Sequence, residues 1–351
     1  MTATTGSAGS AGSAAVRAGG VADTTLEVDN LVVDVLTESG WATVVDGVSF
    51  SVRRGETLGI VGESGSGKSV TCLSIAGLMP PKQTRVRADT LRLLDHDLTR
   101  LTPKQMSDVR GPTISMIFQE PMSSLNPAFT VGDQIAEVLR RHEGASRRES
   151  KRRAVELLDR VGVPSPARRA TQYPFEFSGG MRQRVMIAIA LACNPDVIVA
   201  DEPTTALDVT VQAQILELLR EVQREHGMSV IFITHDLGVV ADVCDRVLVM
   251  YAGQIVEGAG LDELFEFPRH PYMEGLLAAM PRMDDPSDAL ASIPGHPPRI
   301  GAMPAGCRFH PRCRYAADAC VGGGTPPLEV VAAHHTTRCL RHSELTLRGN
   351  P

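Results

Sequence analysis

The sequence lacks a hydrophobic run long enough to cross a membrane as a helix. A spanning helix needs about 18 or more consecutive apolar residues. The longest apolar stretches here, such as RVLVMYAG, have only the length of buried strands. Any membrane role is therefore expected to be peripheral.

An excess of positive charge is also missing. The 35 lysine and arginine residues are outnumbered by 41 aspartates and glutamates, which gives a net charge of −6. A chain of this charge has no overall electrostatic attraction to nucleic acid or to an anionic membrane surface. Nucleic acid is therefore not an expected partner. At 43% apolar and 22% charged residues, the composition is that of an ordinary folded protein.

The N-terminus lacks the basic flank and bulky apolar run of a secretory signal. Its small residues, MTATTGSAGSAGSAAVRAGG, predict a disordered tail over residues 1–24. We therefore expect the chain to remain in the cytoplasm, where disulfides are disfavoured. Only seven cysteines are present, and three of them lie within GCRFHPRCRYAADAC. A fourth, Cys339, follows later in the C-terminal region. The remaining three, Cys72, Cys193 and Cys244, lie in apolar patterns that favour a core position.

The hydrophobic patterns predict an α/β fold with several parts. Alternation in TLEVDNLVVDVL and TVVDGVSFSV indicates antiparallel strands. DVIVAD, VTVQAQILELLREVQREHG and SVIFITHD read as strand, helix and strand of a parallel sheet. Between these parts, residues from about 130 to 175 carry helical patterns and the basic run RRESKRR, which is typical of a solvated helix face.

The composition changes after Phe267. Nine of the 23 prolines lie between Pro268 and Pro311, which predicts an appendage built from loops that does not continue the sheet. We therefore expect a main domain over residues 25–267, with a helical subdomain at about 120–180, and an extension over residues 268–351.

The stretch GESGSGKS, residues 62–69, matches the pattern G-x-x-x-x-G-K-[ST] between a strand and a helix. The glycines let backbone N–H groups surround phosphates, the lysine reaches the β and γ phosphates, and the final hydroxyl ligates Mg²⁺. The motif therefore predicts an ATP site. Its expected nucleotide contacts are Gly62, Ser64, Gly65, Gly67, Lys68, Ser69 and Val70.

A second candidate element is VIVADEP, in which a buried strand ends in two acids. Side chains alternate in direction along a strand, so the two carboxylates must have different roles. Asp201 is the expected Mg²⁺ partner, together with Ser69, and Glu202 is the expected base for the attacking water.

Further motifs lie at fixed places between and after these two: MIFQEPMSSLNP, FSGGMRQR, TTALD and FITHD. In order and spacing the whole set resembles the nucleotide-binding subunit of an ABC transporter, with the P-loop NTPase fold that this family shares. The resemblance assigns roles to Gln119 in the Q-loop, Ser178, Gly179 and Gly180 in the signature, Asp208 in the D-loop and His235 in the switch.

In this family the signature of one subunit caps the ATP held by the P-loop of another. The resemblance therefore implies a second ATPase subunit, expected to be a paralogue in a heterodimer. It also implies that His235 contacts the γ phosphate, that Gln119 contacts the metal and the water, and that Gln183 lies among the nucleotide contacts. Trp41 is the nearest candidate for an aromatic stacked on adenine, although it lies one or two residues from the usual place, and simple packing is the alternative.

Several stretches, among them RHPYMEGLLAAMP and GCRFHPRC, resemble the ATPase subunits of oligopeptide and dipeptide permeases. Cys307, Cys313, Cys320 and Cys339 follow a C-x5-C-x6-C-x18-C spacing. The close spacings are too wide for a zinc knuckle, whereas an iron–sulfur cube accepts unevenly spaced thiolates. The resemblance implies a [4Fe-4S] cluster in this tail, with zinc or no metal as the alternatives.

The resulting prediction is a peripheral ATPase at the cytoplasmic face of the cell membrane. The resemblance implies two transmembrane permease subunits, an extracytoplasmic peptide-binding protein and uptake of di- and oligopeptides. Import of nickel, glutathione or murein peptides is the alternative within this subfamily. A soluble ABC-type switch in DNA repair or translation is the alternative from another class.

Overall fold

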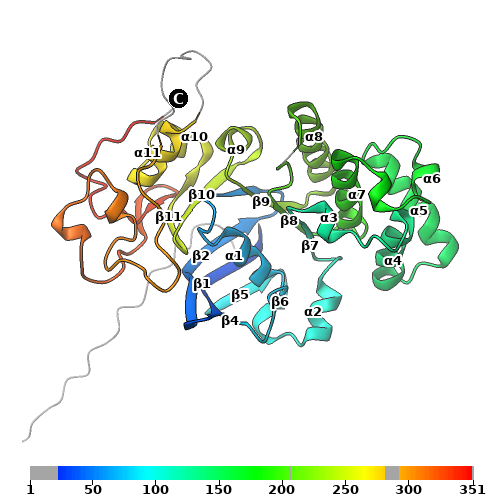
Figure 1. The fold of residues 1–351 in the computed structure, drawn as a ribbon, viewed down its shortest axis with the longest axis horizontal. Helices are drawn as coiled ribbons and strands as arrows, with labels where there is room; N and C mark the ends of the chain where they lie inside the picture. The colour runs from blue at the N-terminus through cyan, green and yellow to red at the C-terminus, as the bar shows by residue number, and fades with distance from the viewer. Residues whose placement is uncertain (1–22, 206, 281–291, 350–351) are drawn as a thin grey trace, which may run out of the picture.

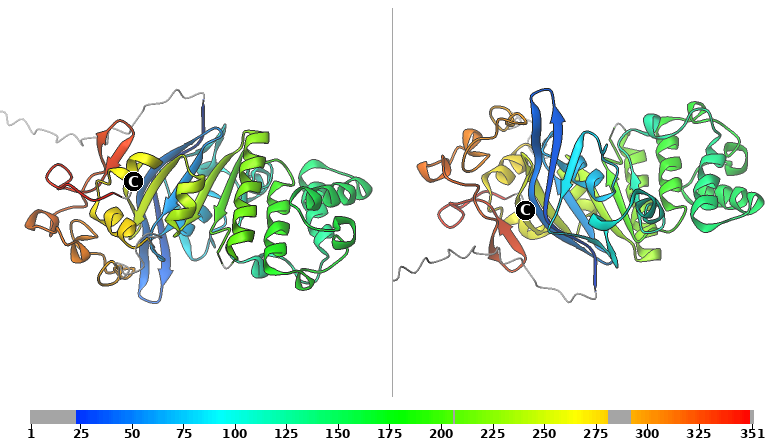
Figure 2. Two further views of the ribbon diagram at one scale, coloured as in Figure 1. Left: turned by 90° about the horizontal axis from the view of Figure 1, so that it is seen from above. Right: turned by 90° about the horizontal axis from the view of Figure 1, so that it is seen from below.

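The computed structural model describes residues 23–205, 207–280 and 292–349. Apart from its last two residues, the predicted tail of residues 1–24 lies outside this range. The described chain is elongated, with the sheets in the middle, a helical region at one end and the C-terminal extension at the other (Figures 1 and 2). None of the helices in these three ranges is both long and apolar enough to cross a membrane.

The first sheet is antiparallel, as the alternating pattern predicts. Its strand order is β2-β1-β5-β6, and β4 pairs with β1 outside this path. Its strands are β1 (Thr24–Thr37), β2 (Gly40–Arg53), β4 (Thr84–Arg87), β5 (Thr90–Leu93) and β6 (His96–Asp97). Apolar residues of β1, β2 and β5 face the second sheet, where they form one of the two hydrophobic cores.

The second sheet has eight strands in the order β12-β13-β11-β10-β3-β9-β8-β7, and the strands from β10 to β7 are parallel. The parallel strands are β3 (Thr57–Val61), β7 (Ile114–Ile117), β8 (Val197–Asp201), β9 (Ser229–Thr234) and β10 (Arg246–Tyr251). Every residue of β3, β8 and β9 is buried, as their continuous apolar sequences predict.

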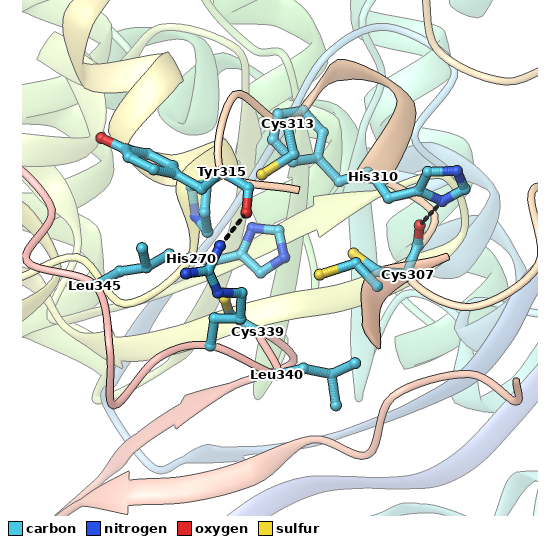
Figure 3. Close-up of a pocket in the computed structure, with 12 residues that line it drawn as sticks. His270, Cys307, His310, Cys313, Tyr315, Cys339, Leu340 and Leu345 are labelled. Carbon is cyan, nitrogen blue, oxygen red and sulfur yellow. Dashed lines mark hydrogen bonds between the residues drawn. The ribbon is translucent and has the colours of Figure 1, made fainter. Parts of the chain in front are cut away.

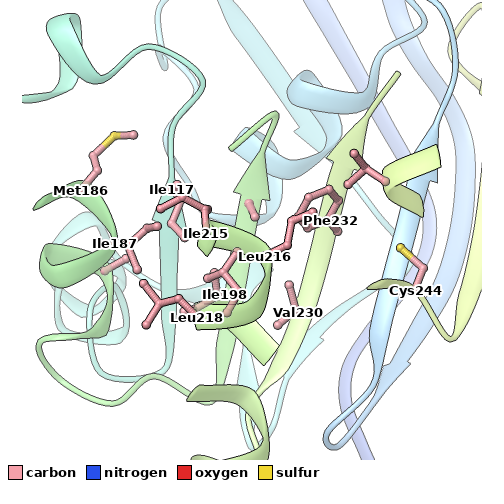
Figure 4. Close-up of a cluster of buried hydrophobic side chains, with 14 of the residues drawn as sticks. Ile117, Met186, Ile187, Ile198, Ile215, Leu216, Leu218, Val230, Phe232 and Cys244 are labelled. Carbon is pink, nitrogen blue, oxygen red and sulfur yellow. The ribbon is translucent and has the colours of Figure 1, made fainter. Parts of the chain in front are cut away.

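The two faces of this sheet belong to different cores. Val197 and Val199 of β8 face α1 (Lys68–Ile75) and the antiparallel sheet. Ile198 and Ala200 of the same strand face α8 (Val209–His226) and α7 (Gly179–Leu191), a layer shown in Figure 4. The parallel sheet is therefore covered on both sides, which leaves its polar strand ends as the place for a site.

The helical region joins β7 to β8 and is shown in green in Figure 1. Side-chain caps fix the starts of its longer helices: Thr130 for α4 and Ser146 for α5. As predicted, the basic run of α5 is largely exposed. The elements of this region are α3 (Pro121–Ser124), α4 (Val131–Glu143), α5 (Arg147–Arg160), α6 (Pro166–Arg169), η3 (Pro174–Glu176) and α7. Two short elements precede β7: η2 (Leu98–Arg100) and α2 (Pro103–Val109).

The C-terminal extension differs from its prediction in one respect. We expected an appendage that does not continue the sheet, but β12 (Glu329–Ala332) and β13 (His335–Thr337) form a hairpin, and β13 pairs with β11 (Gln254–Gly260). None of the prolines lies in this hairpin, which follows the proline-rich stretch, whereas α11 begins within that stretch at Pro271. The other elements after β9 are α9 (Leu237–Val243), α10 (Leu261–Glu266), α11 (Pro271–Ala278) and the short 3₁₀ turns η4 (His310–Arg312) and η5 (Asp318–Cys320).

A buried carboxylate joins this hairpin to the main domain. Glu257 of β11 has no exposed surface and accepts a hydrogen bond from the His270 amide at 2.9 Å. Nε2 of His335, on β13, lies 2.8 Å from Glu257 Oε1, and its Nδ1 lies 3.2 Å from Glu263 Oε1. Burial alone would lower the pKa of His335, but the two carboxylates raise it. Burial is also the main reason why the pKa of Glu257 is raised.

Candidate functional site

The predicted P-loop connects β3 to α1 in a conformation that requires glycine. Gly62, Gly65 and Gly67 have φ angles of 150°, 77° and 104°. A Cβ atom on Gly62 would lie 2.1 Å from the carbonyl oxygen of Met250, so no other residue fits there. Helix α1 begins directly after Gly67 without a side-chain cap, so its first N–H groups are available for an anion. Ser64 and Gly65 are exposed, and Val70 is half-buried.

The side chain of Lys68 folds over the loop. Its Nζ donates to the carbonyl oxygens of Gly62 at 2.7 Å and Glu63 at 3.0 Å. Burial lowers the pKa of Lys68, and the carboxylates of Glu202, Asp201 and Glu63 oppose this shift. These contacts place the ammonium group inside the loop, where a phosphate would meet it.

Ser69 and Asp201 meet as predicted for a metal pair. Asp201 ends β8, and its Oδ1 accepts a hydrogen bond from Ser69 Oγ at 2.9 Å. Burial is the main cause that raises the pKa of this carboxyl group. Oxygen donors of this kind suit Mg²⁺.

Glu202 lies one residue further on and has a left-handed backbone, with φ of 46°. Such a conformation is strained for a non-glycine residue and is frequent at functional sites. Its carboxylate accepts hydrogen bonds from Gln119 Nε2 at 2.8 Å and Thr205 Oγ1 at 2.9 Å, and His235 Nδ1 lies 3.2 Å away. The structure thus brings together Glu202, Gln119 and His235, all three of the predicted catalytic residues.

The same contacts set the charge of Glu202. Burial, the largest single influence, raises its pKa, but hydrogen bonds from His235 and Thr205 and the charge of Lys68 together outweigh it and lower the pKa. The group is therefore an ionised carboxylate at neutral pH. Thr205 was not predicted as a site residue, although its place in TTALD, three residues after Glu202, was the available signal.

The predicted signature residues begin α7, away from the P-loop. Ser178 is the N-cap, and Ser178 and Gly179 are exposed. Asp208 likewise caps α8 by accepting from the Val211 amide at 2.9 Å. Gln183 is only 2% exposed within the helical region, so contact with a nucleotide would require it to move out.

Trp41 lies near the start of β2 and is 40% exposed. The guanidinium carbon of Arg85 lies 3.9 Å from the centre of its ring, which is a cation–π contact. One face of the ring is therefore occupied within the chain. Its predicted stacking on adenine stays a prediction, and Arg85 is a neighbour that the sequence did not reveal.

The four C-terminal cysteines line one pocket, together with His270, His310 and Tyr315 (Figure 3). Burial raises the pKa of Cys307, Cys313 and Cys339, in the last case to about 12, and the neighbouring thiols contribute to each shift. Burial also lowers the pKa of His270 to about 3, so this imidazole is neutral. Cys72 and Cys244 are buried, as predicted, and Cys193 is half-buried.

The placement of these side chains does not form a metal site. Within residues 23–205, 207–280 and 292–349, no three histidine, cysteine, aspartate or glutamate side chains are grouped as metal ligands. Thiolates are suitable ligands for a soft metal group, and the four thiols face one pocket. To bind such a group, their side chains would have to move closer together.

The strand, P-loop and helix arrangement, with two acids at the end of a neighbouring strand, defines a P-loop nucleotide hydrolase. The family model for ABC transporters matches residues 45–205. A model described as the C-terminal region of oligopeptide/dipeptide transporters matches residues 256–320. Together with the relatives below, these matches show that the chain belongs to the ABC transporter family.

Curated relatives are similar over nearly the whole chain. A Brucella abortus (strain 2308) protein with the provisional name of peptide import ATP-binding protein is 50% identical over 331 residues, which is 91% of this chain and 98% of that protein. A Brucella melitensis biotype 1 protein with the same provisional name is 52% identical over 312 residues, covering 86% and 92%.

Solved structures share the fold of the main domain. The dimeric post-hydrolysis structure of the ATP-binding cassette MJ0796, bound to ADP and Pi, is 30% identical, with a TM-score of 0.59. It covers 67% of this chain and 98% of the cassette. CbiO1 from Clostridium perfringens, part of the ABC transporter complex cbiONQ, is 27% identical, with a TM-score of 0.56, covering 69% and 91%.

Proposed function

We propose that this chain is the ATP-hydrolysing subunit of an importer for di- and oligopeptides. The observation that carries the proposal is the combination of an ATP-binding cassette with a C-terminal region of the oligopeptide/dipeptide transporter type in one chain. The provisional names of the relatives, which refer to peptide import, support the same cargo class.

The reaction proposed for the site is the attack of water on the γ phosphate of ATP. The P-loop amides and Lys68 would hold the phosphates, and the ionised carboxylate of Glu202 would orient the water and accept its proton. Gln119 and His235, which both contact this carboxylate, would keep it aimed at the water. The backbone strain at Glu202 is consistent with a carboxylate fixed for this role.

Mg²⁺ fits the donors Ser69 Oγ and Asp201 Oδ1, with Gln119 as the further predicted ligand. When bound, it would neutralise charge that develops on the phosphates. Burial raises the pKa of Asp201, so a cation bound next to this carboxylate would stabilise its charged form.

A second ATPase subunit is part of the proposal. Ser178 and Gly179 begin a helix whose exposed N-terminus can donate to a γ phosphate on another subunit. The cassette MJ0796 has been solved as a dimer, which supports such an arrangement. In a pair of this chain with a paralogue, Ser178→Arg is expected to impair the site whose P-loop belongs to the partner. Full-rate hydrolysis by the purified monomer would contradict the shared site.

Two membrane permeases and an extracytoplasmic peptide-binding protein complete the proposed complex, which places this chain at the cytoplasmic face of the membrane. The helical region next to Gln119 offers a surface for the permeases. Its exposed apolar side chains are Met122, Phe129, Tyr173 and Phe175.

The finer proposal for the extension is a [4Fe-4S] cluster held by Cys307, Cys313, Cys320 and Cys339, with zinc as the alternative. Their shared pocket and thiolate chemistry support it. When bound, such a group would clip together a segment that has little core of its own. Protein purified without oxygen should then be brown and contain about four irons per chain, and Cys313→Ser should be colourless. Stoichiometric zinc without iron would contradict the cluster.

The experiment that tests the transport function is reconstitution with the candidate permeases in lipid vesicles. We expect ATP hydrolysis to drive peptide uptake, and Lys68→Ala to abolish both. Uptake of nickel or glutathione in place of peptides would select the alternative cargo. Copurification with nucleic acid or ribosomes, without integral membrane proteins, would favour the soluble switch.

A further inference from the structure

The segment between the first two cysteines, residues 307–313, lies against the P-loop. Arg312 of this segment has a side chain that is only 4% exposed. Its two terminal nitrogens donate to the two carboxylate oxygens of Glu63, at 2.6 and 2.9 Å. Its Nε donates to the carbonyl of Pro294 at 2.8 Å, so both sides of the guanidinium group are held.

Glu63 is the second residue of the P-loop, and each of its polar groups has a partner. Its amide donates to Tyr272 Oη at 2.8 Å, and its carbonyl accepts from Lys68 Nζ at 3.0 Å. The charge of its carboxylate also acts on Lys68. Movement of Glu63 would therefore displace an atom that positions the phosphate-binding lysine.

Two further contacts join the same segment to residues that themselves adjoin the loop, such as Tyr272, which accepts from the Glu63 amide. The ring of Phe309 packs on Tyr251 and Tyr272, with centroids 5.2 and 5.3 Å apart. Arg308 donates to the carbonyl of Ala252 at 2.6 Å, in the turn whose next amide donates to the P-loop carbonyl of Ser66. The segment thus supports the P-loop from the side of the extension.

We propose that Arg312 is a positioning residue for the nucleotide site. It neutralises the Glu63 carboxylate, which would otherwise repel the phosphates, and it fixes the P-loop to the cysteine-bearing segment. Through this ion pair, ATP affinity depends on whether the segment is docked. The inference rests on the proposed function only in assuming that the P-loop binds ATP.

The test compares four variants by the Kd of a fluorescent ATP analogue with Mg²⁺, and by KM and kcat of hydrolysis. Arg312→Met removes the charge and should weaken binding about tenfold, because it leaves an unpaired carboxylate on the loop. The weaker binding should appear as a higher KM, whereas kcat should change less. Arg314→Met is the matched control, because Arg314 directly follows this segment but is 67% exposed and pairs with Glu274. The Kd of this variant should stay within about twofold of wild type.

Glu63→Gln should weaken binding only about two- to threefold, because the charge that it leaves unpaired, on the Arg312 guanidinium, is positive and does not repel the phosphates. In the double variant, Glu63→Gln should restore most of the affinity that Arg312→Met loses. A merely structural role of Arg312 would give no such rescue.

Wild-type affinity in Arg312→Met would overturn the proposal, and so would a double variant no tighter than Arg312→Met. If Arg312→Met loosens the extension, as seen by faster amide exchange over residues 292–349, the rescue still decides, because Glu63→Gln cannot refold that region. A wild-type chain that fails to bind the analogue, with Lys68→Ala as the baseline, would instead contradict the proposed function.

Discussion

The ATP site and the cysteine-bearing extension are held in place in different ways. The site residues lie at the ends of β3, β8 and β9, whose relative positions are fixed by a parallel backbone ladder. In residues 268–280 and 292–349, the described part of the extension, one short hairpin is the only β-structure that pairs with the main domain, and arginine side chains hold this part by donating to backbone carbonyls. Four such bonds are Arg308 to Ala252, Arg312 to Pro294, Arg338 to Ile255 and Arg341 to Tyr315.

This difference indicates what one substitution can do in each region. In the main domain, removal of a side chain of the ATP site should change ATP binding or hydrolysis and leave the fold intact, because backbone pairing between the strands positions the site. In the extension, removal of an arginine removes part of the fold itself, since unpaired buried carbonyls are costly.

The largest effect is expected for Glu202→Gln. Loss of the base should lower ATP turnover by about 10²–10⁴-fold, whereas nucleotide affinity should remain near wild type. Measurement of kcat and of analogue binding separates the two, with the exposed Glu225→Gln as a control. Wild-type turnover in Glu202→Gln would place the base elsewhere.

Lys68→Ala should act on binding itself. Removal of the ammonium group from the phosphates should weaken nucleotide affinity about 10- to 100-fold, because a charge-assisted contact is lost. Thermal unfolding without nucleotide should change little. Lys104→Ala, which removes an exposed lysine, is the control. Unchanged affinity in Lys68→Ala would contradict the placement of the phosphate site.

Arg338→Ala should reduce the stability of the fold more than the chemistry of the ATP site. Its Nε and a terminal nitrogen donate to the carbonyls of Ile255 and Pro326 at 2.8 and 2.6 Å. Their loss should lower the free energy of unfolding by about 2–3 kcal/mol and speed amide exchange in β12 and β13. Turnover per folded molecule should fall less than in Glu202→Gln. Arg299→Ala, at an exposed position, should leave exchange unchanged.

The smallest effect is a pH dependence of the hairpin. Both His335 and Glu257 have a raised pKa in the folded chain, so the folded state binds more protons than the unfolded state. Stability is then lost as the pH rises: for Glu257 above its ordinary value of 4.5, and for His335 from 6.5 upward through its raised pKa. Amide exchange in β13 should be faster at pH 8 than at pH 6, after correction for intrinsic rates. His335→Gln should reduce this difference, and an unchanged difference would contradict the assignment.

The sequence predicted the ATP site better than the extension, for a physical reason. Ser69, Asp201, Gln119 and Glu202 lie in motifs with fixed spacing, at strand ends that a parallel sheet must bring to one edge. Their roles in binding and catalysis remain predictions, but the structure confirms that they lie together. Thr205 was not among the predicted residues, although its place in TTALD, three residues after Glu202, was a signal that the motif offered.

The extension could not be predicted in the same way. Arg312 and Glu63 are 249 residues apart, and Glu63 occupies an unspecified position of its motif, so no local pattern connects them. The strand β13 is a short polar run, HTT, whose partner β11 lies far earlier in the chain. Pairings of this kind depend on tertiary packing, which a periodicity does not report.

The hairpin of the extension also has a consequence for any shortened form of this protein. Six of the seven residues of β11 are buried, and β13 pairs with its outer side through Glu257 and Gly258. A chain cut after residue 267, where the main domain was expected to end, would turn β11 into an open edge strand. Such strands recruit other chains and aggregate. The C-terminal hairpin thus covers the edge of β11. A truncated protein is expected to self-associate even with its ATP site intact.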